Sequence, residues 1–422
     1  MLGIPLPPYL RVSLAQSHSP TTKPFVWPDD IVHVGPHRLR NLVKPGMRVT
    51  IAFTDATRAC PDELLVGWLV EQLMALGVAP AKITLLCATG LHRPINQAEL
   101  LVKLGSQLAE NIRIANHYAL DPGALIDLGE LETLLLITDR LCVETDLLLA
   151  TGVVEPHQYA GYSGGAKTVV IGCGGEATIQ ATHSAAMLDQ PGVRLGAIAG
   201  NPFQAFVRQA GARIGLAYVV NVVLSEQGDI IAAAAGGPED VHDYLVEQAR
   251  MVYEVTVERP AHVAVAGVNP AKAVNLYQAS RAATYLALAD QTPLLPGAPI
   301  VLPAPIPEGA GQGLGEQRFY ELLAQAESPT QLLADLRQHG FPAGGQRAYI
   351  LAQVLTQHPI IVVGATCPEV VQACHMQAAS DLAAGLTLAE ELARRHFDLP
   401  TPAPLDCLVV PQALLTLPRL TE

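Results

Sequence analysis

The sequence lacks the features that would place it in a membrane, in the secretory pathway or on nucleic acid. None of its apolar runs reaches 18 residues, and its first residues lack the charged-then-apolar layout of a signal peptide. Its seven cysteines are scattered and form no C-x-x-C pair, which favours reduced and mostly buried thiols. A net charge of −13 disfavours nucleic acid or an anionic membrane as partner. We therefore expect a cytoplasmic protein.

The chain is also poor in aromatic residues, at 5%, whereas hydrophobic residues as a whole make up 50%. Short apolar runs bounded by turn residues alternate with helical patterns such as Asp62–Gly77 and Gln346–Leu355. This alternation predicts an α/β fold with Rossmann-like, mostly parallel sheets flanked by helices, and Tyr218–Leu224 with Ile230–Ala235 predicts a hairpin. The expected strands are Arg48–Phe53, Lys82–Cys87, Ile112–Ala115, Asp146–Ala150, Thr168–Ile171, Ala217–Leu224, His262–Ala266, Pro299–Leu302, Pro359–Val363 and Leu405–Val410.

The length of 422 residues exceeds the usual size of one domain, so we expect two. Arg259-Pro260 interrupts the pattern and places the boundary there. The N-terminal domain would span residues 1–260 and the C-terminal domain residues 261–399. After a proline-rich strip, residues 400–422 are expected to pack back on the first domain.

The stretch Pro156–Lys167 (PHQYAGYSGGAK) is the most informative in the chain. It follows Thr145–Gly152, an apolar run that predicts a buried strand, so it lies where open α/β sheets bind ligands. Its glycines allow the backbone to approach an anion closely, and we expect a phosphate there. Lys167 can pair with that anion or form a bond to the ligand, and His183 follows 16 residues later. These residue types together indicate a cofactor site.

A nucleotide-hydrolase phosphate loop is a remote alternative for the same stretch. Gly161–Thr168 fits G-x-x-x-x-G-K-[ST] except that Ala166 replaces the last glycine. This alternative leaves His157 and His183 without a function, and no strand ending in a magnesium-binding acid is obvious downstream.

Two further loops follow predicted strands. Phe53–Arg58 supplies the Asp55 carboxylate and the Arg58 guanidinium, which could clamp a substrate carboxylate with two hydrogen bonds. A surface turn with a local ion pair is equally compatible with this motif. Ala88–Pro94 places His92 just before a helix expected from Pro94, where a lone histidine is more often structural. All three loops follow neighbouring strands and should converge on one cleft.

In their order and spacing, these motifs resemble the nickel-pincer lactate racemase family. Each short motif is weak, but the set extends over most of the chain. The matching residues are Asp55-x-Thr57-Arg58, Gly90-x-His92-Arg93-Pro94, the Pro156–Lys167 stretch, Thr178-Ile179 with His183, Tyr277-Gln278 and Arg347-Ala348-Tyr349.

The resemblance implies a cofactor, the pyridinium-3-thioamide-5-thiocarboxylate mononucleotide that holds Ni²⁺ as an S–C–S pincer. Lys167 would be joined covalently through the thioamide, and His183 would be the remaining nickel ligand, since Ni(II) accepts sulfur and imidazole donors. Cofactor biosynthesis proteins would be needed for maturation. The residues expected to contact the mononucleotide are Tyr162, Ser163, Gly164 and Gly165.

The implied reaction is inversion of the α-carbon of a small 2-hydroxy acid by reversible hydride transfer to the cofactor. His92 and His157 would be paired acid/base residues, because a pKa near about 6.5 lets either ring take up or release the hydroxyl proton. Residues of both domains would contact the substrate in an interdomain cleft. They are Asp55, Arg58, Tyr277, Gln278 and Arg281. Among them, Asp55 is more suited to orienting a neighbouring residue than to reacting.

The sequence departs from the family pattern at three places, and these departures affect the expected substrate rather than the expected reaction. Arg281 stands where the family usually has lysine, Gln346-Arg347 where it often has His-Lys, and Ile171-Gly172-Cys173 where it usually has Pro-Gly. Arginine presents a planar fork that can grip two oxygens. We therefore expect a substrate with a further polar group, such as a sugar acid or a hydroxydicarboxylate, to be preferred over lactate; the competing interpretation is that Arg281 takes over the lysine's contact.

A non-catalytic carrier or sensor of the same cofactor is the alternative from a different functional class. A carrier would need Lys167 and His183 but would have no reason to retain both His92 and His157. The presence of both histidines favours the enzyme.

Overall fold

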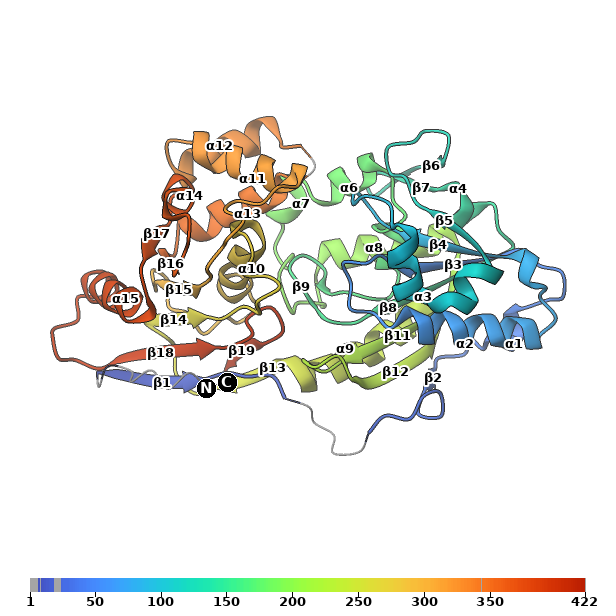
Figure 1. Ribbon diagram of the computed structural model, residues 1–422, viewed down its shortest axis with the longest axis horizontal. Coiled ribbons are helices and arrows are strands. Elements are labelled where there is room, and N and C mark those ends of the chain that lie inside the picture. Colours follow the sequence, from blue (N-terminus) through green and yellow to red (C-terminus); the bar gives the residue numbers. More distant parts are fainter. Residues whose placement is uncertain (1–6, 8, 19–23, 343, 422) are drawn as a thin grey trace.

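The computed structural model describes the chain except for residues 1–6, 8, 19–23, 343 and 422. Two sheets flanked by helices lie side by side in Figure 1, the first on the right and the second on the left. The predicted α/β class with mostly parallel sheets is confirmed.

The first sheet has seven strands in the order β2-β12-β11-β8-β3-β4-β5. Neighbouring strands are parallel except β11 and β12, which form the predicted hairpin. The strands are β2 (Val32–Val34), β3 (Val49–Thr54), β4 (Ile83–Ala88), β5 (Arg113–Asn116), β8 (Leu147–Val153), β11 (Leu216–Leu224) and β12 (Ile230–Gly236).

Both faces of this sheet are buried, which explains why its strands are nearly continuous apolar runs. Alternate residues point to opposite faces, so Ile51 and Leu149 join one buried cluster while Ala52 and Leu148 join another. The helices of the first face are α2 (Asp62–Ala75) and α3 (Gln97–Asn111), and those of the second are α5 (Lys167–Val170), α8 (Pro202–Ile214) and α9 (Pro238–Tyr253).

The second sheet has six strands, all parallel, in the order β1-β18-β14-β15-β16-β17. They are β1 (Leu10–Leu14), β14 (Val263–Ala266), β15 (Ile300–Pro303), β16 (Ile360–Val363), β17 (Gln377–Ala379) and β18 (Leu405–Val410). Helices α10 (Leu276–Ala287) and α13 (Gln346–Leu355) pack on one face and α15 (Leu382–Phe397) on the other. Further helices of this half are α11 (Leu314–Gln325), α12 (Pro329–His339) and α14 (Pro368–Ala373).

Shorter elements complete the described part of the chain. Two antiparallel pairs lie outside the large sheets, and β13 pairs with β19 in parallel. These elements are α1 (Leu39–Leu42), the 3-10 helix Pro80–Lys82, β6 (Leu125–Leu131), β7 (Leu134–Asp139), α4 (Arg140–Val143), β9 (Pro156–His157), β10 (Gly161–Tyr162), α6 (Glu176–Thr182), α7 (Ala185–Leu188), β13 (Glu254–Val257) and β19 (Leu417–Leu420).

One predicted strand is wrong, because Thr168–Ile171 lies largely within helix α5. Positive φ angles at Gly164 and Gly165 turn the chain, and the amides of Val169 and Val170 then donate to the Ala166 carbonyl. A four-residue apolar run cannot distinguish a helix from a strand by itself.

The two ends of the chain depart from the predicted division. Strand β1 and strand β18 lie next to each other in the second sheet, although residues 1–260 and 400–422 were both expected in the first domain; β19, at the end of the same tail, does pair with β13 of the first half. The apolar run of β18 is buried because β1 and β14 flank it on either side. The boundary near residue 260 remains a prediction.

Asp189, at the end of α7, joins the first half of the chain to helices α12 and α13. Its carboxylate accepts hydrogen bonds from Arg337 Nε at 2.8 Å, Tyr349 Oη at 2.6 Å and Gln353 Nε2 at 2.8 Å. One buried apolar cluster also continues from the first sheet to the second.

All seven cysteines are free thiols, and six of them are buried, as predicted. Among the described residues, we find no helix with both the length and the apolar character needed to span a membrane.

Candidate active site

Three neighbouring parallel strands of the first sheet, β8, β3 and β4, end at the same edge. The loops after β3, β4 and β8 carry Asp55, His92 and His157, respectively. All three residues line one cavity, as expected for loops at the carboxyl ends of parallel strands.

This cavity, which we call the cleft cavity, has a volume of about 230 Å³. A single water needs only about 10–15 Å³ by the same kind of measure, so the space suits a much larger ligand. Side chains of both halves of the chain line it. From the first half they include Asp55, Arg58, His92, His157, Tyr159, Ser163, Lys167 and His183, and from the second half Tyr277, Gln346 and Arg347.

The glycine-rich turn forms the small antiparallel pair β9 and β10 beside the cavity. Gly161 has φ +73°, and any side chain there would collide with the Ala197 carbonyl. Gly164 has φ +88°, and a Cβ would lie 2.6 Å from Val154 Cγ2. The Ser163 hydroxyl secures the turn by donating to the Val153 carbonyl at 2.7 Å. Ser163 and Gly164 thereby keep fixed positions on the cavity wall.

Lys167 begins helix α5 directly after this turn. Burial lowers the pKa of its ammonium from 10.5 to about 7, and the positive charge of Arg58 adds to this effect. A substantial fraction of Lys167 is therefore a neutral amine near neutral pH, and a neutral amine is a nucleophile.

His183 follows helix α6, and its ring orientation is fixed by the helix. Its Nδ1 lies 2.8 Å from the Ile179 carbonyl oxygen. A carbonyl only accepts hydrogen bonds, so the ring proton lies on Nδ1 and Nε2 keeps its lone pair. Burial lowers the pKa of His183 to about 4, which keeps that lone pair free of a proton.

His92 is paired with Asp55. Its Nδ1 lies 2.6 Å from Asp55 Oδ2, and Asp55 Oδ1 accepts from the Thr57 hydroxyl at 2.8 Å. Burial alone would raise the pKa of Asp55, but the hydrogen bond and charge of His92 outweigh it and lower that pKa. The ionised carboxylate places the proton of neutral His92 on Nδ1, so Nε2 can accept a proton.

His157 has the opposite arrangement. Its Nδ1 accepts hydrogen bonds from the backbone amides of Tyr159 at 3.3 Å and Ala160 at 3.2 Å. The proton of the neutral ring therefore lies on Nε2. Burial, followed by the charge of Lys167, holds the pKa of His157 well below its usual value.

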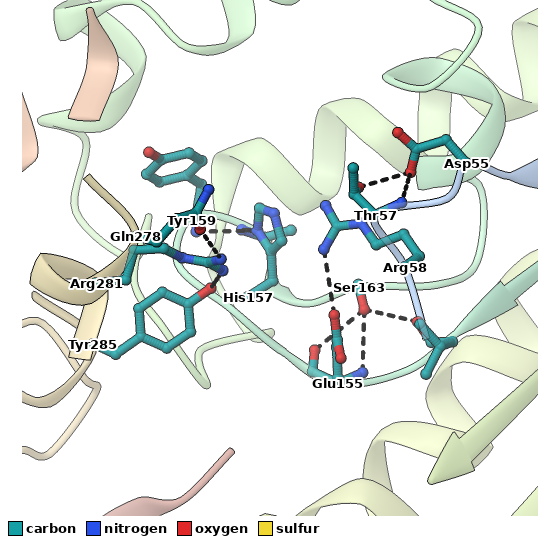
Figure 2. A network of polar contacts seen from close by, with 12 residues as sticks. Asp55, Thr57, Arg58, Glu155, His157, Tyr159, Ser163, Gln278, Arg281 and Tyr285 are labelled. Atoms are coloured by element: carbon teal, nitrogen blue, oxygen red, sulfur yellow. Dashed lines mark hydrogen bonds and ion pairs between the residues drawn. The ribbon is translucent and has the colours of Figure 1, made fainter. Parts of the chain in front are cut away.

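Two arginines approach the site from opposite sides (Figure 2). Arg58 of the first half donates to Glu155 at 3.3 Å. Arg281 of α10 donates to Tyr285 Oη at 2.9 Å and contacts Gln278 Oε1 at 3.5 Å. Arg281 and Gln278 thus lie beside the site without being lining residues of the cleft cavity.

Two residues expected to contact the cofactor, Tyr162 and Gly165, do not line the cleft cavity, and their contact with the cofactor remains a prediction. The Tyr162 hydroxyl donates to Glu254 Oε1 at 3.0 Å, and the ring is buried away from the cleft cavity. The Gly165 amide donates to Asn221 Oδ1 at 2.7 Å, and its Cα faces His242. Within this turn Ser163 and Gly164 line the cavity, whereas Tyr162 and Gly165 on either side of them do not.

Sequence reasoning did not assign a site function to Tyr159, Glu155 or Arg347. The Tyr159 ring lies edge-on to His157 and His183, with centroid distances of 5.6 and 5.3 Å. The Arg347 guanidinium lies 4.7 Å from the centroid of the Tyr277 ring. The position of Glu155 directly after β8 could have indicated a site residue. The contacts of Tyr159 and Arg347 depend on tertiary packing.

Comparison with known proteins agrees with this architecture. Residues 30–196 match the lactate racemase N-terminal domain family, and residues 261–400 match the lactate racemase C-terminal domain family. The lactate racemase of Lactiplantibacillus plantarum is 30% identical over 357 residues, which cover 83% of this chain and 81% of that protein. The lactate racemase of Thermoanaerobacterium thermosaccharolyticum is 29% identical over 374 residues, covering 85% and 83%.

Two solved structures are similar as well. The lactate racemase apoprotein of Thermoanaerobacterium thermosaccharolyticum superposes with a TM-score of 0.85 at 25% identity, covering 99% of this chain and 97% of that one. A Thermotoga maritima protein shares the fold with a TM-score of 0.68 at 20% identity, covering 91% and 96%. The chain therefore belongs to the lactate racemase family, and it is an isomerase of the racemase type.

Proposed function

We propose that this protein racemises or epimerises a 2-hydroxy acid with a nickel pincer nucleotide bound to Lys167. One observation carries the proposal: Lys167, His183, His92 and His157 all line the cleft cavity. A carrier of the cofactor would use only the first two, so the arrangement favours the enzyme.

The residues present fit the cofactor. Lys167 has the lowered pKa that a thioamide-forming amine requires, and His183 presents a free Nε2 while its Nδ1 is held by a backbone carbonyl, as is usual for metal-bound histidines. In the described part of the chain, no group of three or more His, Cys, Asp and Glu side chains could hold a metal. His183 would be the ligand from this chain because its free Nε2 lies on the wall of the cleft cavity, with the pincer supplying the others, and Ser163 and Gly164 would lie against the mononucleotide.

When bound, the cofactor would supply a hydride acceptor and donor for the α-carbon of the substrate. His92 Nε2 is poised to take the hydroxyl proton, because Asp55 holds the ring proton on Nδ1. His157 Nε2 carries the ring proton and is poised to donate a hydrogen bond to the substrate oxygen. Since either enantiomer must react, His157 would also have to accept a proton at Nε2, for which its Nδ1 would have to exchange the two amide contacts for a proton.

Arg58 would hold the carboxylate next to the reacting carbon. Its contact with Glu155 involves one guanidinium nitrogen at 3.3 Å, which leaves other N–H groups for two carboxylate oxygens. Tyr277 lines the cleft cavity from the second half, and Gln278 lies next to it. Cofactor biosynthesis proteins would be needed to produce the cofactor and thus the mature enzyme.

Coexpression with those biosynthesis proteins tests the proposal. We expect a peptide map with the added mass on Lys167, bound nickel, and racemisation of 2-hydroxy acids. Lys167→Ala should lose all three, whereas Lys82→Ala, at an exposed lysine, should retain them. Active enzyme with unmodified Lys167 would contradict the attachment. Loaded protein that racemises no 2-hydroxy acid would favour the carrier.

A further inference from the structure

Three cations lie together on the side of the cleft cavity formed by the second half of the chain: Lys272, Arg281 and Arg347. Among the described residues, none of the three forms an ion pair with a carboxylate. The contacts of Arg281 are with Tyr285 and Gln278, and Arg347 lies over the ring of Tyr277. We call these three residues the cation cluster.

Arg347 lines the cleft cavity, and Arg281 contacts Gln278 and Tyr285 beside it. Burial lowers the pKa of Lys272, and the charges of Arg281, Arg347 and Arg58 lower it further. Arg281 also contributes to the lowered pKa of His157. The cluster therefore acts on the same space as the catalytic histidine, and Arg347 reaches the cleft cavity itself.

On the opposite side of the cleft, the positive charges need no anion to neutralise them. Arg58 already contacts Glu155, and Lys167 readily loses its proton. In the cluster, by contrast, Arg281 Nε is buried without a hydrogen-bond partner. Half-buried cations of like sign without a carboxylate partner repel one another, and a bound anion relieves both the repulsion and the missing hydrogen bond of Arg281 Nε. A monocarboxylate held by Arg58 would leave the cluster unpaired.

We propose that the cation cluster binds the second carboxylate of a 2-hydroxydicarboxylate substrate, while Arg58 binds the carboxylate beside the reacting carbon. This inference rests on the proposed function. It narrows the expected substrate from any polar 2-hydroxy acid to a doubly anionic one, since three cations match added charge better than the uncharged hydroxyls of a sugar acid. The phosphate of the mononucleotide is the other anion that the same cations suit.

A substrate comparison with the loaded enzyme tests the inference. We expect kcat/KM for malate to exceed that for lactate and for gluconate at least about 10-fold. Arg281→Gln and Arg347→Gln should each lower kcat/KM for malate about 10–100-fold and that for lactate less than about 3-fold. Arg113→Gln removes the same charge from an exposed position on β5 and should change neither value. Lactate or gluconate with a higher kcat/KM than malate in the wild type would overturn the inference.

Binding to protein expressed without the cofactor gives an independent readout. By calorimetry at low ionic strength, malate should bind at least about 10-fold more tightly than lactate, and Arg281→Gln should abolish that difference. If inorganic phosphate binds more tightly than malate, and the variant loses both phosphate binding and cofactor loading, the cluster serves the cofactor and the inference fails.

A failure of the proposed function can be distinguished from a failure of this inference. Loaded enzyme that racemises no 2-hydroxy acid contradicts that function, and malate binding to the unloaded protein and its Arg281→Gln variant still decides the role of the cluster. Arg281→Lys keeps the charge but loses the planar fork, so an intermediate malate affinity would support binding of two carboxylate oxygens by Arg281.

Discussion

The two sides of the cleft cavity handle charge in different ways. On the side of the first sheet, ionisable groups pair within the chain: His92 with Asp55 at 2.6 Å and Arg58 with Glu155 at 3.3 Å. On the opposite side, Lys272, Arg281 and Arg347 have no carboxylate partner among the described residues. Paired groups keep a fixed orientation, which proton transfer requires, whereas unpaired cations retain their capacity to bind an anion. Under the proposed function, the chemistry belongs to the side with paired groups, and under the further inference, substrate selection belongs to the side with unpaired cations.

Removing the histidines should affect the chemical side most strongly. His92→Ala and His157→Ala should each lower kcat by ~10²–10⁴-fold, the usual loss of acid/base catalysis, while retaining nickel. His183→Ala should instead lose the metal. Nickel analysis beside chiral product assays separates the two classes, and equal nickel loss in all three variants would show that the roles are wrongly divided.

The buried Lys167 predicts a pH-dependent cost to the unloaded protein. Between pH 7 and 10.5 the unfolded chain holds a proton on Lys167 that the folded chain has lost, so stability should rise with pH across this window. Below pH 7 the folded chain bears the full free-energy cost of holding Lys167 charged. Lys167→Met should therefore stabilise the unloaded protein by on the order of a few kcal/mol near pH 6, and progressively less toward pH 10. Denaturant unfolding at several pH values measures this, and a pH-independent difference would contradict it.

Asp55→Asn should weaken the pair that orients His92. The amide can donate to the ring, which favours the wrong tautomer, so kcat should fall about 10–100-fold while KM changes little. Long-range ¹H–¹⁵N spectra of the histidines would show the ring proton of His92 on Nδ1 in the wild type and shifted toward Nε2 in the variant. An unchanged tautomer would mean that Asp55 does not position His92.

The smallest expected effect concerns the contact that holds the two sides together. Asp189→Ala removes the acceptor shared by Arg337, Tyr349 and Gln353. Because the Asp189 and Arg337 side chains are 34% and 49% exposed, the loss in unfolding free energy should be only about 0.5–1 kcal/mol. Glu144→Ala, which removes an exposed pair within α4 and its cap, is a matched control. If the contact also aligns the two sides, Asp189→Ala should lower kcat/KM. An unchanged kcat/KM would show that it does not align them.

Much of the fold followed from local patterns. The strands of the two large sheets that the chain's apolar runs predicted are present within a few residues, because a strand buried on both faces must be apolar throughout. Thr168–Ile171 was mistaken for a strand because four apolar residues carry no period, and the strand β1 was missed because its exposed positions interrupt the apolar run.

The candidate site was predicted in part for a related reason. Loops after parallel strands meet at one edge of a sheet, so the order of the chain brought Asp55, His92, His157 and Lys167 together in the prediction. The direction of a side chain within a turn is not encoded in spacing, and for that reason the sequence did not predict that Tyr162 and Gly165 lie off the lining of the cavity.

The sequence by itself determined which chemical groups are available and which strand end carries each of them. Only the tertiary structure decided how they pair, because His92 and Asp55 are 37 residues apart, and Arg58 and Glu155 are 97 apart. Whether a titratable group finds a partner depends on which segments pack around it, and burial then sets its pKa. The lowered pKa of Lys167 and the unpaired charges of Lys272, Arg281 and Arg347 are consequences of that packing rather than of any local motif.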